Sequence, residues 1–340
     1  MGIAVISVLP ALLAVMVSAV RRALPKAPQT WALAALVGGI FVWMLSFLPA
    51  VSAAGALEIS IPWVPAIGLT LAFYVDGLAL LFALVIVGIG TTIVIYTGYY
   101  FDDIAELDQF YIRLLAFMSA MLVVVLAGNL LTLFIGWELT SVISFLLIGF
   151  NRDSDAARRG ALQALIVTGA GGLALLVGLV LLGTAAGTME ISQLLASGEL
   201  HNHPWYTAFT ILILVGCFTK SAQWPFHFWL PGAMNAPTPA SAYLHSATMV
   251  KAGIYLLLRL APVLSGTLLW QNALIGIGLI TMLLGAVLAL RQTDLRRRWL
   301  TRPSASLVCW SPSSVCRKVM GGRRRWWAFW RTASTKPLCL

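Results

Sequence analysis

Nine apolar windows of about 20 residues follow one another along most of the chain. They cover residues 3–20, 30–52, 70–97, 112–128, 130–149, 162–186, 208–230, 238–260 and 270–290. A helical window of this length matches the hydrocarbon thickness of a bilayer. Because backbone groups in lipid must find hydrogen-bond partners within the protein, such windows predict helices. The sequence therefore predicts an all-α, polytopic membrane protein with about nine spans.

The composition agrees with a membrane protein and argues against a nucleic-acid-binding one. Of the 340 residues, 60% are hydrophobic and 10% are charged, against roughly 25% charged in soluble domains. The net charge of +10 comes from the tail, because 11 of the 22 Lys and Arg lie at or after Arg296. Before that position 11 basic residues stand against 12 acidic ones. We expect no nucleic-acid partner, and the four cysteines have no metal-ligand spacing.

The distribution of Lys and Arg predicts how the chain is oriented in the membrane. Basic loops favour the cytoplasmic side. Eight basic residues fall on one side of the predicted spans: Arg21, Arg22, Lys26, Arg113, Arg152, Arg158, Arg159 and Arg291. The opposite loops, 53–69 and 187–207, contain neither Lys nor Arg, and Arg259 is the exception. Positive charges follow the first window instead of preceding it, unlike a cleaved signal peptide. We expect a retained first helix with its N-terminus outside.

Ionisable residues lie within two adjacent windows, 208–230 and 238–260, at depths where lipid is expected. Lys220 and Lys251 lie inside them, and His245 lies between the two lysines. A charge near the bilayer centre costs roughly 2.5–3.5 kcal/mol, so such residues are typical of ion pathways, proton relays or buried pairs. Pro225 removes a backbone hydrogen bond and predicts a broken helix. Irregular backbone at this depth is tolerated only against protein or a water-filled cavity. The combination indicates ion transport.

Glu138 lies near the middle of window 130–149 and needs a partner from another helix, because no Lys or Arg lies within several turns of it. Lys220, similarly central in its window, is the natural candidate, since apposed opposite charges lower each other's burial cost. One interpretation is a structural ion pair that fixes helix packing. The other is a switch in proton transfer, because removal from water lets a lysine release its proton.

Three further polar residues each allow a structural and a functional interpretation. His245 suits proton transfer near neutral pH, but a lone histidine in a span is often only hydrogen-bonded to a neighbour. It lies six residues before Lys251, on a different face of a regular helix, so a relay between them needs water or a broken turn. His227 lies in an aromatic cluster that an interfacial belt explains. Asp76 either caps a helix start or belongs to the pathway.

Other clusters have simpler explanations. An acidic loop is expected to be solvated surface: Asp102, Asp103, Glu106 and Asp108. No strand precedes the glycines of window 162–186, so they suit close helix packing better than nucleotide binding: Gly169, Gly171, Gly172, Gly178, Gly183 and Gly187. The pair His201 and His203 is weak evidence for a metal, and we expect none.

Three motifs resemble the antiporter-like subunits shared by respiratory complex I and Mrp-type cation/proton antiporters. They are WELTS with Glu138, FTKSAQWPFHFWLP with Lys220, and PTPASAYLHSATMVKAG with His245 and Lys251. The resemblance covers residues 60–295 and is closer to the large A subunit of Mrp antiporters. It implies inverted repeats of five helices, of which this chain holds the first and the start of the second. It assigns Glu138 and Lys220 to the first half-channel and His245 to the relay toward the next.

The resemblance also implies the function and the partners. We expect a transporter subunit, not an enzyme, that exchanges H⁺ for a monovalent cation, Na⁺, in a bacterial inner membrane. Its partners are other membrane subunits and lipid, and no cofactor is implied. One alternative is the proton-pumping membrane subunit of NADH:quinone oxidoreductase. Another is a truncated, non-transporting chain in which the Glu–Lys pair serves only packing.

The tail departs from the apolar continuation that the family implies. We therefore divide the chain into an incomplete antiporter-like domain, 1–295, and an aberrant basic tail, 296–340. The gene can also be read in another frame, in which each new codon joins the third base of one codon to the first two bases of the next. In that frame the codons of Leu300–Trp310 permit the sequence AYASVSQLGLL, and those of Trp326–Cys339 permit VGILAHGLYKAAL. Both strings resemble the expected continuation. They predict a frame shift near residues 296–298, from a mutation or a sequencing error, which would remove the second half-channel.

Overall fold

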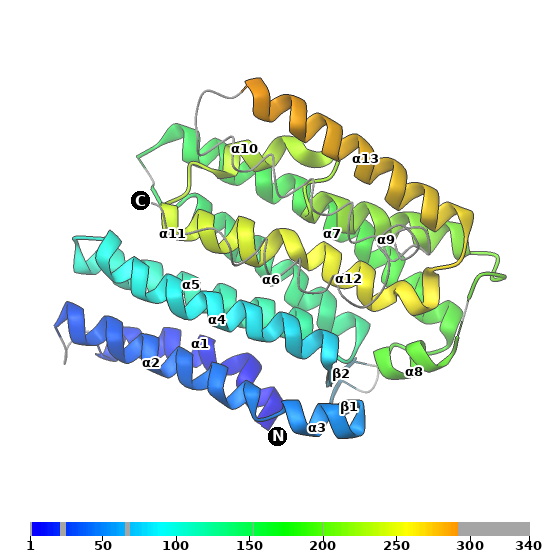
Figure 1. Cartoon of the computed structure of the whole chain (residues 1–340), viewed down its shortest axis with the longest axis horizontal. Helices are drawn as coiled ribbons and strands as arrows, with labels where there is room; N and C mark the ends of the chain where they lie inside the picture. The colour runs from blue at the N-terminus through cyan, green and yellow to red at the C-terminus, as the bar shows by residue number, and fades with distance from the viewer. Residues whose placement is uncertain (1, 21–24, 65–68, 152, 199, 292–340) are drawn as a thin grey trace.

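The computed structural model describes residues 2–20, 25–64, 69–151, 153–198 and 200–291. Long helices lie side by side in a bundle (Figure 1). The elements are α1 (Gly2–Val20), α2 (Lys26–Leu45), α3 (Leu48–Ala54), β1 (Ala56–Val64), β2 (Leu69–Asp76), α4 (Gly77–Tyr100), α5 (Ile104–Leu126), α6 (Leu130–Ile148), α7 (Asp155–Ala186), α8 (Ile191–Ala196), α9 (Tyr206–Lys220), the 3₁₀-helix η2 (Phe226–Phe228), α10 (Trp229–Ala233), α11 (Thr238–Ser241), the π-helix η3 (Ala242–Ala247), α12 (Met249–Leu264) and α13 (Leu268–Arg291). The predicted tail and the boundary at 295/296 lie outside the described residues.

The predicted helical membrane protein is confirmed. Within the described ranges, seven helical segments are long and apolar enough to cross a bilayer: Lys26–Ala54, Gly77–Tyr100, Ile104–Leu126, Leu130–Ile148, Asp155–Ala186, Thr238–Leu264 and Leu268–Leu288. Two shorter apolar helices, Val5–Val17 and Tyr206–Lys220, occupy the windows predicted for the first and seventh spans. The count of about nine spans is thus not reached by helix length, and stays a prediction.

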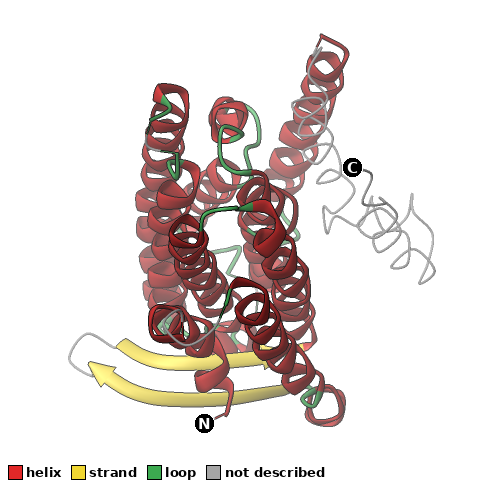
Figure 2. Ribbon diagram, turned by 90° about the vertical axis from the view of Figure 1, so that its left-hand side faces the viewer, coloured by secondary structure: helices red, strands yellow, loops and turns green. Residues whose placement is uncertain are grey.

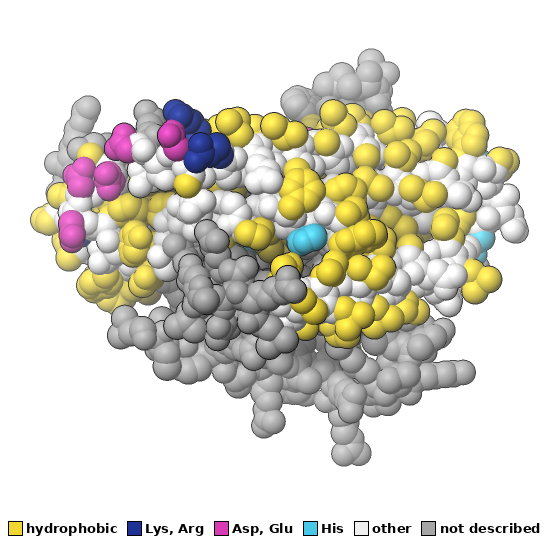
Figure 3. Space-filling view, turned by 90° about the horizontal axis from the view of Figure 1, so that it is seen from above, with side chains coloured by type: hydrophobic (Ala, Val, Ile, Leu, Met, Phe, Trp, Pro, Cys, Tyr) yellow, Lys and Arg dark blue, Asp and Glu magenta, His cyan; other side chains and the backbone are white. Residues whose placement is uncertain are grey.

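The surface agrees with a membrane environment. Figure 3 shows one face of the molecule, on which hydrophobic side chains are spread over much of the part that is not drawn in grey. The charged side chains on this face gather toward one end. An apolar exterior of this extent on a soluble protein would be an interaction site or a source of aggregation. Here it provides the lipid-facing surface of the bundle.

A two-stranded antiparallel sheet interrupts the helical fold, where the sequence predicts none. β1 and β2 pair from Ala56 opposite Asp76 to Val64 opposite Leu69, and they lie side by side at the border of the bundle (Figure 2). The apolar residues of this segment fit an outer loop and the first turns of a span equally well, which hides the strands. Phe73 of β2 also pairs with Ala127, just after α5. The hairpin therefore lies at the end of the bundle where α4 begins and α5 ends.

Four consecutive long helices begin at residues whose side chains accept a backbone hydrogen bond. These caps are Asp76 for α4, Asp103 for α5, Asn129 for α6 and Ser154 for α7. A cap of this kind contributes roughly 1 kcal/mol because it satisfies an otherwise unpaired N–H. The structural interpretation of Asp76 as a helix cap is therefore confirmed.

The acidic cluster divides between surface and interior. Asp102 and Asp103 are exposed, but Asp108 is buried on α5, where one carboxylate oxygen accepts a hydrogen bond of 2.8 Å from the Gln29 amide of α2. The prediction of a wholly solvated acidic loop is wrong for Asp108. The register of α5 turns this residue toward α2, and a buried carboxylate needs such a donor.

Some of the glycines predicted to allow close packing do so, such as Gly171 and Gly178 of α7, whereas Gly169 meets no atom within 4 Å. A Cβ at Gly171 would overlap Thr219 of α9, and one at Gly178 would lie 2.9 Å from Ile213. Gly187 follows the helix in the left-handed conformation, with φ 72°. The α7–α9 contact holds α9, with Lys220 at its end, against the rest of the bundle.

Candidate functional site

Lys220 is the last residue of α9 and is fully buried, with 0% of its surface exposed. Its ammonium donates hydrogen bonds of 2.7 Å to the Ser141 hydroxyl and 3.1 Å to the Trp137 carbonyl, both on α6. The same group lies 5.2 Å from the centroid of the Trp137 ring. The sequence predicts Lys220 in the middle of a helix, whereas the structure places it at a helix end. A cation is favourable there because the helix dipole is negative at its C-terminus.

The end of α9 is a backbone motif that the sequence hides. Ala222 adopts φ 50°, its N–H bonds to Thr219, and the N–H of Gln223 bonds to Phe218. This is the Schellman arrangement that usually requires glycine. Alanine costs about 1–2 kcal/mol in the left-handed region. The helix therefore stops before Pro225, and the interruption covers residues 221–225 up to η2.

Trp229 connects the end of α9 to His245. Its indole N–H donates to the Thr219 carbonyl at 3.0 Å, and its ring centroid lies 6.0 Å from that of His245. Trp229 is fully buried, so the prediction that an interfacial aromatic belt explains the whole cluster around it is wrong for this residue. Trp224 and Phe228 are exposed, as such a belt requires. Trp229 instead fills the space between the two interrupted segments.

His245 and Lys251 lie on opposite sides of a second interruption. His245 is buried in the π-helix η3, and Lys251 lies in the first turn of α12. Thr248 separates them with φ −126° and ψ −80°, and its hydroxyl bonds to the Tyr243 carbonyl at 2.8 Å. π-helical turns are rare and frequent at functional sites. The broken turn that a relay between His245 and Lys251 requires is present in the backbone.

The two interruptions contact each other directly. The Ser221 hydroxyl, next to Lys220, donates a hydrogen bond of 2.8 Å to the carbonyl of Val250, next to Lys251. A Cβ at Gly253 would overlap the Ser221 hydroxyl and the Cys217 carbonyl. The glycine thus permits this close approach of α12 to α9. A hydrogen bond therefore joins the segment that carries Lys220 to the segment that carries Lys251.

Glu138 lies one residue after Trp137 on α6. Its Oε1 is buried and, within the described ranges, has no hydrogen-bond partner. A Cβ at Gly172 of α7 would overlap this oxygen, so the carboxylate lies directly against the glycine. Glu138 and Lys220 are close enough to interact electrostatically. The hydrogen bonds of the Lys220 ammonium, however, go to Ser141 and Trp137. A direct Glu138–Lys220 ion pair stays a prediction.

The two weaker candidates, His227 and Asp76, have different surroundings. His227, in η2, is half-buried, and its Nδ1 has no hydrogen-bond partner in the described part of the chain. Asp76, at the β2–α4 junction, pairs with Arg259 of α12 at 2.7 Å. No group of three metal-binding side chains occurs among the residues that the structure describes. The charge pattern of the loops marks Arg259 only as an exception and gives no sign of this pairing.

Two family models match the chain. Residues 127–300 match the model described as NADH:quinone oxidoreductase/Mrp antiporter, TM, and residues 63–111 match the N-terminus of chain 5 of NADH-ubiquinone oxidoreductase (complex I). The first match covers half of the chain and contains both interruptions together with Lys220 and Lys251. The chain belongs to the NADH:quinone oxidoreductase/Mrp antiporter family. The resemblance predicted from the three motifs is confirmed.

Curated relatives are components of antiporters. The chain is 48% identical over 268 residues to the A/B subunit of a probable K⁺/H⁺ antiporter of Rhizobium meliloti, covering 78% of this chain and 27% of the relative. It is 44% identical over 289 residues to the A subunit of the Na⁺/H⁺ antiporter of Alkalihalophilus pseudofirmus, covering 84% and 36%. The chain thus spans between a quarter and somewhat over a third of these proteins.

Solved structures show the same fold. An Mrp complex from Dietzia sp. superposes with a TM-score of 0.81 at 33% identity, over 91% of this chain and 33% of the other. The membrane-bound sulfane sulfur reductase, an archaeal respiratory membrane complex, gives a TM-score of 0.75 at 22% identity, over 91% and 64%. The second likeness concerns the fold alone.

Proposed function

We propose that this chain is part of a membrane subunit of a multisubunit cation/proton antiporter, with a proton pathway through Glu138, Lys220, His245 and Lys251. The observation that carries the proposal is the fully buried Lys220 at the interrupted end of α9, hydrogen-bonded through Ser221 to the first turn of α12. The protein resides in a bacterial plasma membrane, with its N-terminus outside and other membrane subunits as partners.

The surroundings of Lys220 suit a group that takes up and releases a proton. Its ammonium bonds to one hydroxyl and one carbonyl, which are neutral acceptors, so a full countercharge does not lock it in the charged form. Burial disfavours the charged form of an amine. Glu138, on the same helix α6 as both acceptors, supplies a negative charge at longer range. A change in the separation of these two groups then changes whether Lys220 holds its proton.

The depth of Lys220 supports the same function. Helix α9 has 15 residues and is about 22 Å long, which is shorter than the roughly 30 Å hydrocarbon core. A span that starts at the membrane border therefore ends within the core, where Lys220 and the freed backbone groups are. Interrupted helices near the midplane are typical of secondary transporters. From there the route continues past Trp229 and His245 to Lys251.

The alternatives make different demands. A proton-pumping subunit of NADH:quinone oxidoreductase would use the same residues, and the matching family model is described by both classes of protein. The antiporter is favoured because the relatives at 42–48% identity are antiporter subunits. Their names include both K⁺ and Na⁺, so both ions belong in the test. A chain that only scaffolds other subunits would tolerate loss of the Lys220 charge.

The test measures exchange in everted membrane vesicles. The gene is expressed with its flanking genes in a bacterial host that lacks antiporters of its own, and dissipation of a respiration-driven pH gradient is followed by fluorescence on adding Na⁺ or K⁺. We expect Lys220→Ala to reduce exchange to background while the chain remains in the membrane. Arg158→Ala is the matched control, because this side chain is 66% exposed.

Two outcomes contradict the proposal. If the parent proteins dissipate the gradient with neither cation, antiport is refuted. If Lys220→Ala exchanges at the parent rate, the pathway assigned here is wrong, although antiport by the complex stands. A respiratory subunit would instead show proton pumping driven by NADH oxidation and no cation-dependent dissipation.

A further inference from the structure

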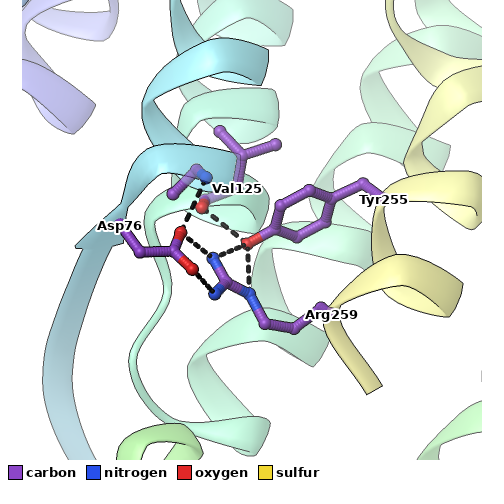
Figure 4. Close-up of polar contacts among 5 residues, drawn as sticks. Asp76, Val125, Tyr255 and Arg259 are labelled. Atoms are coloured by element: carbon purple, nitrogen blue, oxygen red, sulfur yellow. Dashed lines mark hydrogen bonds and ion pairs between the residues drawn. The ribbon is translucent and has the colours of Figure 1, made fainter. Parts of the chain in front are cut away.

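Arg259 forms the most extensive charged contact among the described residues, and it lies away from the lysine pathway. Its side chain is 1% exposed. NH1 and NH2 bind the two carboxylate oxygens of Asp76 at 2.7 and 3.0 Å, and Nε and NH2 bind the Tyr255 hydroxyl at 3.0 and 2.8 Å (Figure 4). The guanidinium also lies 5.1 Å from the centroid of the Tyr74 ring. A forked, buried contact of this kind fixes both position and orientation.

The contact joins four elements at one end of the bundle. Asp76 ends β2 and caps α4 through the Ala79 N–H at 2.9 Å. Tyr255 of α12 donates its hydroxyl to the Val125 carbonyl, in the last turn of α5, at 2.7 Å. Figure 4 shows the arginine reaching from α12 toward the β2–α4 junction, with the tyrosine beside it. Helix α12 is therefore bound to α5 by Tyr255, near its middle, and to the β2–α4 junction by Arg259, in its C-terminal half.

The other half of α12 carries the proposed pathway. Lys251, Tyr255 and Arg259 are spaced by four residues and follow one face of the helix. Eight residues separate the lysine from the arginine, about 12 Å along the axis. The segment before α12 is the interrupted stretch that holds His245, where the backbone forms a π-helix instead of a regular α-helix. The arginine contact thus fixes a helix that is preceded, at its N-terminus, by an irregular segment.

We propose that Arg259 and Asp76 are positioning residues of the antiporter: their ion pair holds α12 against α4 and α5, so that Lys251 and His245 keep their places in the pathway. The proposal rests on the function proposed above. The proposal gives a role to Arg259, the one basic residue that does not follow the charge pattern of the loops. Arg259 lies on the predicted outer side because Asp76 and Tyr255 neutralise and satisfy it there.

Substitutions can separate the charge from the helix cap. Asp76→Asn keeps an oxygen that caps α4, since asparagine is as good a cap as aspartate. It removes the charge that faces Arg259. Arg259→Gln removes the other charge, and the double variant leaves no stranded ion. Arg259→Lys keeps a charge but loses the planar fork. Asp155→Asn is the control, because it breaks the exposed pair with Arg158.

Two measurements are made on the full chain. Hydrogen–deuterium exchange in lipid nanodiscs reports the backbone, and vesicle exchange reports transport. In Asp76→Asn and in Arg259→Gln we expect faster deuterium uptake confined to residues 238–260, and a maximum exchange rate lowered roughly tenfold or more. The half-saturating cation concentration should not change. The double variant should recover part of the rate, Arg259→Lys should keep part of it, and Asp155→Asn should match the parent.

Specific results overturn the positioning role. Unchanged deuterium uptake over 238–260 in the single variants would do so, and so would uptake raised over the whole chain, which indicates a general loss of stability. A double variant as slow as the single variants would mean that one of the charges acts in transport itself. Because deuterium uptake needs no transport, it decides this proposal even where the parent shows no exchange and the proposed function fails.

Discussion

A methyl group added at Gly172 should displace the Glu138 carboxylate and little else. The Cβ of Gly172→Ala would lie well inside 3.0 Å of Oε1, a separation that real Cβ atoms essentially never show. The obstructed atom is the far end of a flexible side chain, so the carboxylate moves while the helices stay. Ordinary contact begins at 3.4 Å, so the oxygen must withdraw by about 1.6 Å.

The expected effects on stability and on exchange differ in size. Alanine in place of glycine gains roughly 0.5–1 kcal/mol in a helix. A side chain forced off its rotamer costs about 0.5–1.5 kcal/mol. The two nearly cancel, so the melting temperature of Gly172→Ala should stay close to that of the parent. A misplacement of about 1 Å can lower the rate of a reaction by about 100-fold where charged groups must be aligned. Exchange should therefore fall strongly.

The assay is vesicle exchange per amount of inserted protein, and α7 supplies two controls. Gly169→Ala meets no atom within 4 Å and should exchange normally. Gly160→Ala overlaps the backbone of Gly232, so it should lower the melting temperature and the amount of protein in the membrane. If Gly172→Ala folds and exchanges at the rate of Gly169→Ala, the position of the Glu138 carboxylate does not matter for transport, and its assignment to the pathway fails.

Three further outcomes follow from described contacts. Burial, and then the charge of Asp76, raise the pKa of Tyr74 above its usual 10.0, so the folded state holds this proton more tightly than the unfolded state. The free energy of unfolding should therefore fall as pH rises above 10.0. Tyr74→Phe should make the melting temperature less sensitive to pH in that range. Asp108→Ala removes the acceptor of the buried Gln29 amide and should lower the free energy of unfolding by about 1–3 kcal/mol, measured by denaturation in detergent. Single cysteines are introduced at position 60 or position 155, both exposed, in a chain without other cysteines. An impermeant maleimide added to intact cells should label the cysteine at position 60, on the predicted outer side, and not the one at position 155. The reverse pattern would refute an N-terminus outside.

The helical architecture could be predicted because it depends on local sequence. A window of about 20 apolar residues in lipid has no alternative to a helix that bonds its own backbone groups. The hairpin escapes prediction for a related reason. Segments such as ALEISIPWV and LTLAFYVD are short, apolar and rich in β-branched and aromatic residues, and a short apolar run of this kind does not distinguish strand from helix.

The end of α9 escapes prediction because its signal is unusual. Glycine commonly marks the left-handed residue after a helix, and this chain has Ala222 there. The sequence therefore points to proline as the breaking residue and to the middle of a span for Lys220. The lysine itself is recognisable, because a charge within an apolar window is conspicuous whatever the local backbone does.

The partners of buried charges depend on contacts that no local pattern encodes. Asp76 and Arg259 are 183 residues apart, and Gln29 and Asp108 are 79 apart. The sequence shows that these side chains are charged or polar, but not that they meet. The distribution of charges in the loops identifies Arg259 as an exception, but it does not predict that Asp76 is its ion-pair partner.

The described contacts suggest why three residues of the proposed pathway, Lys220, His245 and Lys251, occur at or beside interruptions instead of within regular helices. At each interruption a side chain from another segment binds a helix carbonyl: the Trp229 indole donates to the Thr219 carbonyl, and the Ser221 hydroxyl donates to the Val250 carbonyl. Each interruption is thus stabilised by a side chain of the other segment or of its neighbour. Because Ser221 follows Lys220 and Val250 precedes Lys251, the hydrogen bond between Ser221 and Val250 joins the segments that carry the two lysines of the proposed pathway. If these residues carry protons, this bond gives a route by which a change at one lysine alters the surroundings of the other, which is what energetic coupling between two sites requires.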